Sequence, residues 1–252
     1  MHPRPLKLMT LNTWCGRVHN DLMAFLATYQ DTDIFCLQEI SYKAVQGSIK
    51  HDRFDPAWNL FEEIEDALPG HQGFFRKHYM DTFGLATFVK SDSDIEVINE
   101  TERFVHLPKP DTPVEEGKNA RNLQAVTISV GGKELHIFNF HGLWTGGGKD
   151  DTASRLEQSR NISKFVNEFG SRKILCGDFN LNPETQSVKI LQDIPMRDLV
   201  KEYGVQTTRT SYYPKSLKFA DYIFVDDAID VKDFKVLPDE VSDHSPLLLI
   251  FE

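Results

Sequence analysis

Cysteine is scarce in this sequence, and its scarcity excludes two classes of protein. The chain has 252 residues and only three cysteines, Cys15, Cys36 and Cys176. An odd number of cysteines within apolar segments forms no disulfide framework, and their spacing matches no zinc site. We therefore expect three reduced cysteines packed in the core, which suits a cytosolic protein.

Long hydrophobic runs are also missing. No apolar segment approaches the ~18–20 residues that are needed to cross a bilayer. The first residues, MHPRPLKLMTLNTW, contain neither a hydrophobic signal region nor a small-residue cleavage site. We expect a cytoplasmic protein with no membrane-spanning segment, although a secreted chain whose signal has been removed would have the same sequence.

An excess of positive charge is the third absence. The chain carries 28 basic and 38 acidic residues, a net charge of −10. Proteins that wrap long duplexes usually have a basic footprint, because phosphate contacts dominate their affinity. The charge balance therefore favours a small or single-stranded nucleic acid over a long duplex. A divalent metal ion can supply the positive charge with which an acidic protein binds a phosphoester.

Short apolar runs bounded by polar residues indicate β-strands throughout the chain. Hydrophobic residues make up 40% of the sequence and charged residues 26%, which is typical of a globular protein with a core. No linker, repeat or low-complexity segment divides the chain, so we expect a single domain over residues 1–252. Strands are predicted near residues 6–11, 33–38, 84–89, 123–130, 134–140, 173–176, 220–225 and 246–251.

Helical periodicity appears in three segments between these strands. Apolar residues recur at the 3.6-residue period near 22–29, 57–68 and 162–169. The second helix is predicted to start at Asp55-Pro56, and the third near Asp151. Strands in runs with helices inserted between them predict an α+β fold or a layered sandwich rather than a strict alternation of strand and helix.

Polar residues interrupt the apolar strands at one end of six of them. Each case alone is usually a turn, a helix cap or a solvated loop residue. Six together are hard to explain as independent turns, because Asp and Asn are poor strand residues. The residues are Asn12, Gln38 with Glu39, Asn139 with His141, Asp178 with Asn180, Asp221, and Asp243 with His244.

These residue types point to one kind of chemistry. Carboxylate and carboxamide oxygens are ligands of hard divalent cations such as Mg²⁺. Histidines near aspartates supply acid–base groups close to neutral pH. A metal that polarises a phosphoryl oxygen, a base that activates water and amides that hold the added charge together suit phosphoester hydrolysis. The pattern predicts a Mg²⁺-dependent phosphoesterase in which Mn²⁺ can replace Mg²⁺.

The same stretches resemble the motifs of the endonuclease/exonuclease/phosphatase superfamily and occur in the family's order over the whole chain. That superfamily includes deoxyribonucleases, abasic-site endonucleases, inositol polyphosphate phosphatases, neutral sphingomyelinases and tyrosyl-DNA phosphodiesterases. The resemblance implies a four-layer α/β/β/α sandwich, two packed mixed sheets flanked by helices, with strand ends that meet at one cleft. The matching stretches are Leu11-Asn-Thr-Trp14, Cys36-Leu-Gln-Glu39, Asn139-Phe-His141, Gly177-Asp-Phe-Asn180, Ala220-Asp-Tyr222 and Ser242-Asp-His244.

The resemblance also implies a metal site. Glu39 is expected to be the main Mg²⁺ ligand, with Asn12 beside it. Asp243 is expected to be a further residue of the metal or phosphate site.

Catalytic roles follow from the resemblance in the same way. Asp178 and Asn180 are expected to face the scissile phosphate and the attacking water, and His141 to bind or protonate a phosphate oxygen. His244 is expected to be the general base or a phosphate-binding residue, with its ring oriented by Asp221. Members of the family are interpreted with different bases, so the choice between His244 and Asp178 stays open.

Three further residues are candidates for binding the substrate. Arg121 precedes a strand where family members often carry a phosphate-binding arginine, although a solvated loop arginine fits as well. Trp144 follows the His141 motif and either lines the cleft or packs against the fold. Lys218 lies in the loop 210–219, whose aromatic and basic residues either stack a base and hold a phosphate or form an ordinary exposed loop.

Two features near His141 are open at this stage. The glycine-rich segment 145–149 is either a phosphate cradle or a flexible loop. An acidic partner for His141 is not evident, and Asp81 is the only residue that we suggest.

The function expected from these observations is hydrolysis of phosphodiesters in nucleic acid, by a nuclease or an enzyme that processes strand ends. The alternative is a phosphatase or phosphodiesterase of a small metabolite or lipid headgroup with the same machinery. A non-catalytic binding module is disfavoured, because every motif position holds a residue capable of the chemistry. No partner protein is implied.

Overall fold

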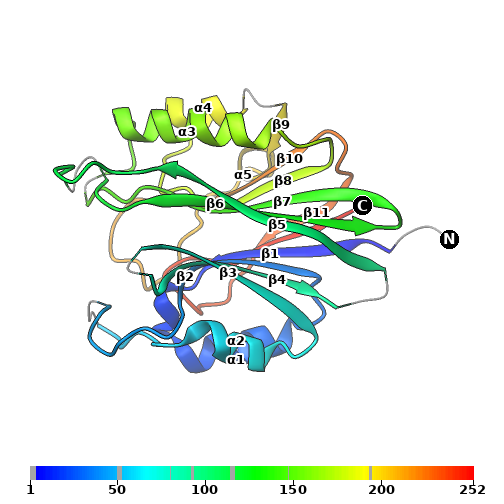
Figure 1. The fold of residues 1–252 in the computed structure, drawn as a ribbon, viewed down its shortest axis with the longest axis horizontal. Helices are drawn as coiled ribbons and strands as arrows, with labels where there is room; N and C mark the ends of the chain where they lie inside the picture. Colours follow the sequence, from blue (N-terminus) through cyan, green and yellow to red (C-terminus); the bar gives the residue numbers. More distant parts are fainter. Residues whose placement is uncertain are drawn as a thin grey trace.

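Two mixed six-stranded sheets pack face to face in the computed structural model (Figure 1). The strand order is β11-β12-β1-β2-β4-β3 in the first sheet and β5-β6-β7-β8-β10-β9 in the second. Helices α1 and α2 lie outside the first sheet, and α3 and α4 lie outside the second, which gives the expected four-layer α/β/β/α sandwich. The structure describes residues 4–49, 53–79, 81–91, 94–113, 117–146, 148–192 and 195–252.

The bounds of the elements are as follows. The first sheet consists of β1 (Leu6–Asn12), β2 (Ile34–Ser41), β3 (His71–Tyr79), β4 (Phe83–Lys90), β11 (Val231–Val236) and β12 (Leu247–Phe251). The second consists of β5 (Ile95–His106), β6 (Arg121–Val130), β7 (Lys133–His141), β8 (Lys173–Asp178), β9 (Met196–Asp198) and β10 (Asp221–Asp226). The helices are the 3₁₀ turn η1 (Trp14–Gly16), α1 (His19–Thr28), α2 (Leu60–Ala67), α3 (Ala153–Val166), α4 (Gln186–Gln192) and α5 (Leu199–Glu202).

All eight predicted strands are present, and four strands that the sequence did not indicate are added to them. The added strands are β3, β5, β9 and β11, and they are the outermost strands of the two sheets. An outermost strand buries less of its surface, so it has no continuous apolar run. In β5, for example, most positions are partly or fully exposed.

The three predicted helices are confirmed, but one of them starts later than expected. Helix α2 begins at Leu60 rather than at Asp55-Pro56. The backbone of Ala57 forms hydrogen bonds outside any helix: its N–H donates to the carbonyl of Cys15, and its carbonyl accepts from the hydroxyl of Ser41. These bonds tie the segment around Ala57 to η1 and to the end of β2, so it is not available for a helical turn.

The topology brings distant strand ends to the same end of the sandwich. Strands β1 and β2 are parallel, as are β7 and β8, while β12 and β10 run antiparallel to these pairs. The last residues of β1, β2, β7 and β8 therefore lie beside the residues that begin β10 and precede β12. The register places Asp178 opposite both His141 and Asp221.

The core lies between the sheets and beneath the helices. One cluster of buried side chains joins the two sheets and α3, and a second joins the first sheet to α1 and α2. All three cysteines are free and buried, as predicted. Within the described parts of the chain, no helix is both long and apolar enough to cross a membrane.

Candidate active site

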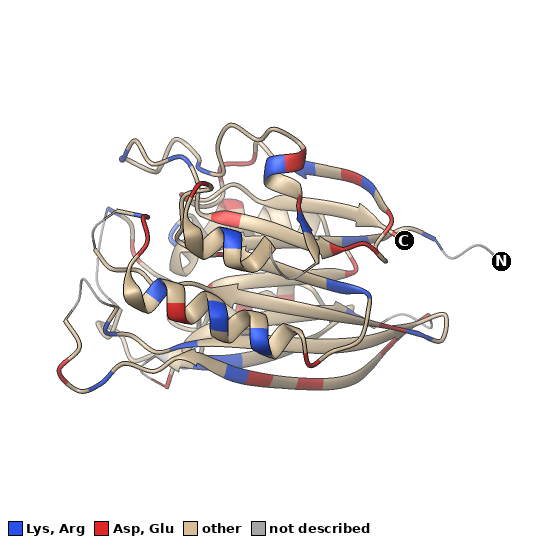
Figure 2. Ribbon diagram, turned by 90° about the horizontal axis from the view of Figure 1, so that it is seen from above, with Lys and Arg blue, Asp and Glu red and all other residues tan. Residues whose placement is uncertain are grey.

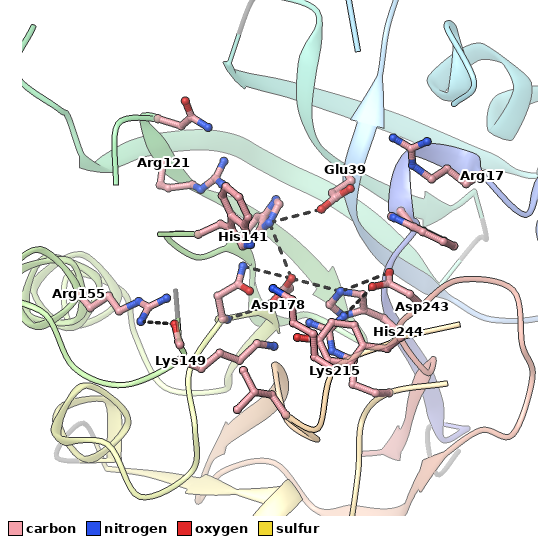
Figure 3. Close-up of a pocket in the computed structure, with 18 of the residues that line it drawn as sticks. Arg17, Glu39, Arg121, His141, Lys149, Arg155, Asp178, Lys215, Asp243 and His244 are labelled. Atoms are coloured by element: carbon pink, nitrogen blue, oxygen red, sulfur yellow. Dashed lines mark hydrogen bonds and ion pairs between the residues drawn. The ribbon is translucent and has the colours of Figure 1, made fainter. Parts of the chain in front are cut away.

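Six of the predicted strand-end residues line one cavity of about 400 Å³: Glu39, His141, Asp178, Asn180, Asp243 and His244 (Figure 3). Glu39, His141, Asp178, Asp243 and His244 point toward one another in this view. They come from parts of the chain that are up to about two hundred positions apart in sequence, and they are joined only by the fold. The convergence that the sequence predicted is therefore present.

A β-bulge directs Glu39 toward the cavity. The pairing of β2 with β4 shifts register between Gln38 and Ile40, and Glu39 there has a positive φ of 58°. Such a backbone conformation is uncommon for a residue with a side chain and is frequent at functional sites. The hydroxyl of Thr13 donates to the carbonyls of Gln38 and Glu39, at 2.9 and 3.3 Å, and supports the bulge.

Asn12 connects the carboxylates of the two sheets. Its Nδ2 donates to Oε1 of Glu39 at 3.1 Å and to Oδ2 of Asp178 at 2.9 Å. Its Oδ1 accepts from the backbone N–H of Trp14 at 2.9 Å, which fixes the orientation of the amide. Asn12 therefore holds Glu39 and Asp178 at a set separation.

Asp178 lies at the centre of the site and is almost fully buried. Its Oδ1 accepts from the backbone N–H of Asn180 at 2.8 Å. Burial alone would raise the pKa of Asp178, but His244, His141 and Lys149 outweigh burial and lower the pKa well below its usual range. Asp178 is thus a carboxylate at neutral pH.

His244 is held by Asp221. Its Nδ1 lies 2.8 and 3.0 Å from the two carboxylate oxygens of Asp221, and Oδ2 of Asp221 also accepts from the hydroxyl of Thr208 at 2.8 Å. The other nitrogen, Nε2, lies 3.6 Å from Oδ2 of Asp178 and 3.7 Å from Oδ1 of Asp243. Burial and Arg209 disfavour protonation of His244, but these three carboxylates together raise its pKa.

Asp243 forms an ion pair with Arg209. The Arg209 NH1 group donates to Oδ2 of Asp243 at 3.0 Å, and the guanidinium stacks 4.0 Å from the ring centroid of Tyr213. Oδ1 of Asp243 is buried and has no hydrogen-bond partner among the described residues. Burial raises the pKa of Asp243 in spite of His244 and Arg209.

His141 faces the same carboxylates from the opposite side. Its Nε2 is 3.9 Å from Oε1 of Glu39 and 3.8 Å from Oδ2 of Asp178, while Nδ1 is buried with no partner in the part of the chain that the structure describes. Burial and the positive charge of Arg121 lower the pKa of His141 to about 3. The suggested partner Asp81 is wrong, because Asp81 is exposed and pairs with Lys77 at 2.6 Å.

The donor set fits a hard divalent cation. Asp178, Asp221 and His244 offer ligand atoms within 4.8 Å of one another. Glu39 and Asp243 add two carboxylates to the same cavity. The unpartnered oxygen of Asp243 is a position that a cation would satisfy, and several carboxylates without a thiol favour Mg²⁺ or Mn²⁺ over zinc.

The three predicted substrate-binding residues are placed differently. Arg121 and Trp144 line the cavity; Arg121 is 4% exposed and Trp144 53%. The solvated-loop alternative for Arg121 is thereby excluded. Lys218 is exposed and is not among the lining residues, whereas Tyr213 and Lys215 of the same loop are.

Several cationic residues of the cavity were not singled out from the sequence. Lys149 is the last residue of the glycine-rich segment 145–149, of which residue 147 lies outside the described residues. Its Nζ donates to the carbonyl of Phe219 at 2.8 Å, and burial lowers its pKa to about 8. The others that line the cavity are Arg17, Arg155 and Arg209. The glycine-rich run was a sequence signal for Lys149, whereas no motif marked Arg17, Arg209 or Arg155, the last of which lies in the first turn of α3.

Two of the polar strand-end residues have a structural role. Gln38 and Asn139 are fully buried between the sheets, where Nε2 of Gln38 donates to Oδ1 of Asn139 at 2.8 Å. Asn139 in turn donates to the carbonyls of Leu37 and Ala86 at 3.2 and 3.0 Å. This layer joins the sheets directly beneath the site and so fixes the distance between its two halves.

Comparison with known proteins gives the same assignment. The model of the endonuclease/exonuclease/phosphatase family matches residues 9–244. A search of curated protein sequences found no match to the chain.

Three solved structures have the same fold. A family protein from Bacteroides thetaiotaomicron is 21% identical, with a TM-score of 0.75 over 100% of this chain and 98% of its own. The mannosyl-6-phosphatase Bt3783 of the same organism is 21% identical, with a TM-score of 0.73 over 98% and 99% of the two chains. The human Nocturnin catalytic domain with bound sulfate is 19% identical, with a TM-score of 0.67 over 100% and 94%. This chain belongs to the endonuclease/exonuclease/phosphatase family of phosphoesterases.

Proposed function

We propose that this chain, as one catalytic domain over residues 1–252, hydrolyses phosphoesters with a divalent cation, Mg²⁺ or Mn²⁺. The observation that carries the proposal is the convergence of Glu39, Asp178 and Asp243 on one cavity that cationic side chains surround. Glu39 and Asp243 would hold the cation, and Asn12 orients Glu39. When bound, the cation offsets the charge of the phosphoryl group and lowers the pKa of water.

The remaining residues supply binding and proton transfer. His244 and Asp178 are both in position to accept the proton of the attacking water, 3.6 Å from each other. Asp221 fixes the ring of His244, as the third group does in other base-orienter pairs. Asn180 and His141 face the scissile phosphate, where an amide and a neutral imidazole donate hydrogen bonds to its oxygens.

Nucleic acid with a free end or a short single strand is the first candidate substrate. Trp14, Trp144 and Tyr213 present aromatic rings around the cavity, and Arg17 and Lys215 add cations at its wall. Aromatic stacking with cations nearby is how proteins commonly bind single strands. Trp144, with half of its surface exposed, is the residue that is best placed to stack on a base.

A small phosphorylated metabolite is the second candidate. The cavity volume of about 400 Å³ suits one small molecule. Seen from the side of α3 and α4, both basic and acidic positions occur along the described residues (Figure 2), and the chain as a whole carries a net charge of −10. The similarity of this chain to a mannosyl-6-phosphatase also favours a phosphorylated metabolite as the substrate.

A substrate panel tests both candidates. The chain with Mg²⁺ would be given duplex, single-stranded and abasic DNA, RNA, nucleoside monophosphates, hexose phosphates, inositol phosphates and sphingomyelin. Phosphate release from the monoesters with no cleavage of any polymer selects the second candidate, and the reverse selects the first. No turnover of any substrate in Mg²⁺ or Mn²⁺ would reject hydrolysis and favour a binding module.

A further inference from the structure

The guanidinium of Arg121 forms hydrogen bonds to two of the described residues at the cavity wall. Its Nε donates to the carbonyl of Gly142 at 2.8 Å, and its NH1 lies 2.9 Å from Nε2 of His78. Both side chains are buried, with 4% and 6% exposure. Arg121 lies next to His141 on the side away from Asp243 (Figure 3). A histidine and an arginine, rather than Asp81, therefore lie beside His141 on this side.

The chemistry of the neighbours fixes the proton on His78. A guanidinium has only donors, so Nε2 of His78 must accept from Arg121. The ring proton is then on Nδ1, which lies 3.0 Å from Oδ1 of Asn122. Nδ2 of Asn122 donates to the carbonyl of Lys77 at 3.2 Å and to the carboxylate of Glu102. Neither of these two groups can donate, so the amide of Asn122 has only this orientation.

In the hydrogen-bonded series Arg121, His78 and Asn122, every donor faces an acceptor only if His78 is a neutral imidazole. Burial, together with the charge of Arg121 and the proximity of His141, lowers the pKa of His78 well below its ordinary value. The ring of His78 also packs edge-on against Phe83 and His141, with centroids 5.9 and 5.7 Å apart. These contacts leave the ring one orientation, with Nε2 toward Arg121.

We propose that His78 is a positioning residue for substrate: it holds the guanidinium of Arg121 where it binds a phosphoryl oxygen beside His141. The proposal rests on the proposed phosphoesterase function and names a residue that does not itself touch the substrate. A purely structural role is the alternative, in which the buried network only joins the ends of β3 and β6.

Two substitutions separate the two nitrogens of His78. In His78→Gln the amide oxygen can reach the position of Nε2 and accept from Arg121. In His78→Asn the shorter amide occupies the position of Nδ1 and leaves Arg121 without this acceptor. The two variants are matched in polarity, so each is the control for the other.

The readout is affinity for inorganic phosphate in the presence of Mn²⁺, measured by calorimetry, and kcat/KM for whichever substrate is turned over. We expect His78→Asn and Arg121→Ala each to weaken phosphate binding about tenfold, the effect of losing one charge-assisted hydrogen bond. His78→Gln should stay within about threefold, and the double variant His78→Asn/Arg121→Ala should bind no worse than Arg121→Ala alone.

Three outcomes would overturn the proposal. They are multiplicative effects in the double variant, an equal loss in His78→Gln and His78→Asn, and unchanged phosphate affinity in His78→Asn with an unchanged melting temperature. If His78→Asn does not fold, His78→Gln carries the test, since a tenfold loss of phosphate affinity in that variant contradicts the proposal. If phosphate binding depends on His78 but the chain turns over no substrate, the proposed hydrolysis is rejected and the role of His78 in binding phosphate stands.

Discussion

The two histidines of the cavity occupy opposite environments. On one side, Nδ1 of His244 forms a hydrogen bond with the carboxylate of Asp221, and three carboxylates raise the pKa of His244. On the other side, His141 has no partner for Nδ1 among the described residues, and burial with Arg121 lowers its pKa to about 3. Both contact Asp178 through Nε2, at 3.6 and 3.8 Å.

The difference shows how one residue type can supply two functions within one site. Environments that push the pKa values of two titratable groups apart are characteristic of acid–base sites. His244 is supported as a group that carries a proton, and His141 as a neutral donor next to Arg121. The neighbours that create the contrast, Asp221 and Arg121, come from the beginnings of β10 and β6.

The largest expected effect comes from replacing Glu39, which Asn12 links to Asp178 through hydrogen bonds from its amide. Glu39→Gln should abolish metal-dependent activity, because it removes the carboxylate that we expect to be the main ligand of the cation. The fold should be retained, since Glu39 lies at a bulge and its side chain is 23% exposed. Activity against Mg²⁺ concentration is the measurement, with the exposed Glu134→Gln as the matched control. Full activity of Glu39→Gln in Mg²⁺ would show that the metal assignment is wrong.

Removing the imidazole of His244 should have the next largest effect. His244→Ala is expected to lower kcat by about 10²–10⁴-fold, the usual cost of losing a positioned acid–base group. The variant should be assayed on the best substrate of the panel, with its melting temperature as the control for folding. A change of less than threefold would remove His244 from the mechanism.

Weakening the support of His244 should cost less than removing it. Asp221→Asn keeps the shape of the side chain and the bond from Thr208 but removes the charge beside Nδ1. We expect about a 10–100-fold loss of activity, the range typical of removing a hydrogen-bonded carboxylate that orients a histidine at a metal site. The measurement is kcat of Asp221→Asn, compared with kcat of His244→Ala on the same substrate. Equal losses in both variants would mean that His244 has no function without Asp221.

The smallest expected effect is on stability against pH. Burial lowers the pKa of His71 and His136, as it does for His78 and His141. Below a pH of about 6.5, the unfolded chain therefore binds more protons than the folded one, so stability falls as the pH falls.

We expect the melting temperature to be lower at pH 5 than at pH 7 by at least about 2–4 °C, the shift produced by roughly 1 kcal/mol in a chain of this length. His136→Gln, which lies outside the cavity lining, should reduce the difference. A melting temperature that rises between pH 7 and pH 5 would contradict the prediction, because the raised pKa of His244 would then dominate.

The sequence predicted the inner strands well and the outer strands poorly. Strands such as β2 and β8 are buried on both faces, so their apolar runs are continuous and easily identified. Strands β5 and β11 consist mostly of exposed and partly buried positions and carry many charges, which also occur in loops. The start of α2 could not be predicted, because backbone bonds of Ala57 to Cys15 and Ser41 override the local signal of Asp55-Pro56.

The sequence by itself determined the inner strands and the polar residues at their ends, because both are local patterns, and the resemblance of its ordered motifs to a known family implied the four-layer fold. Only the tertiary structure decided which cations line the cavity and what holds them. Arg209 meets Asp243 across 34 positions, and Arg121 meets His78 across 43. No sequence period encodes such pairs, since hydrogen bonds between loops and strand ends depend on how two sheets pack against each other.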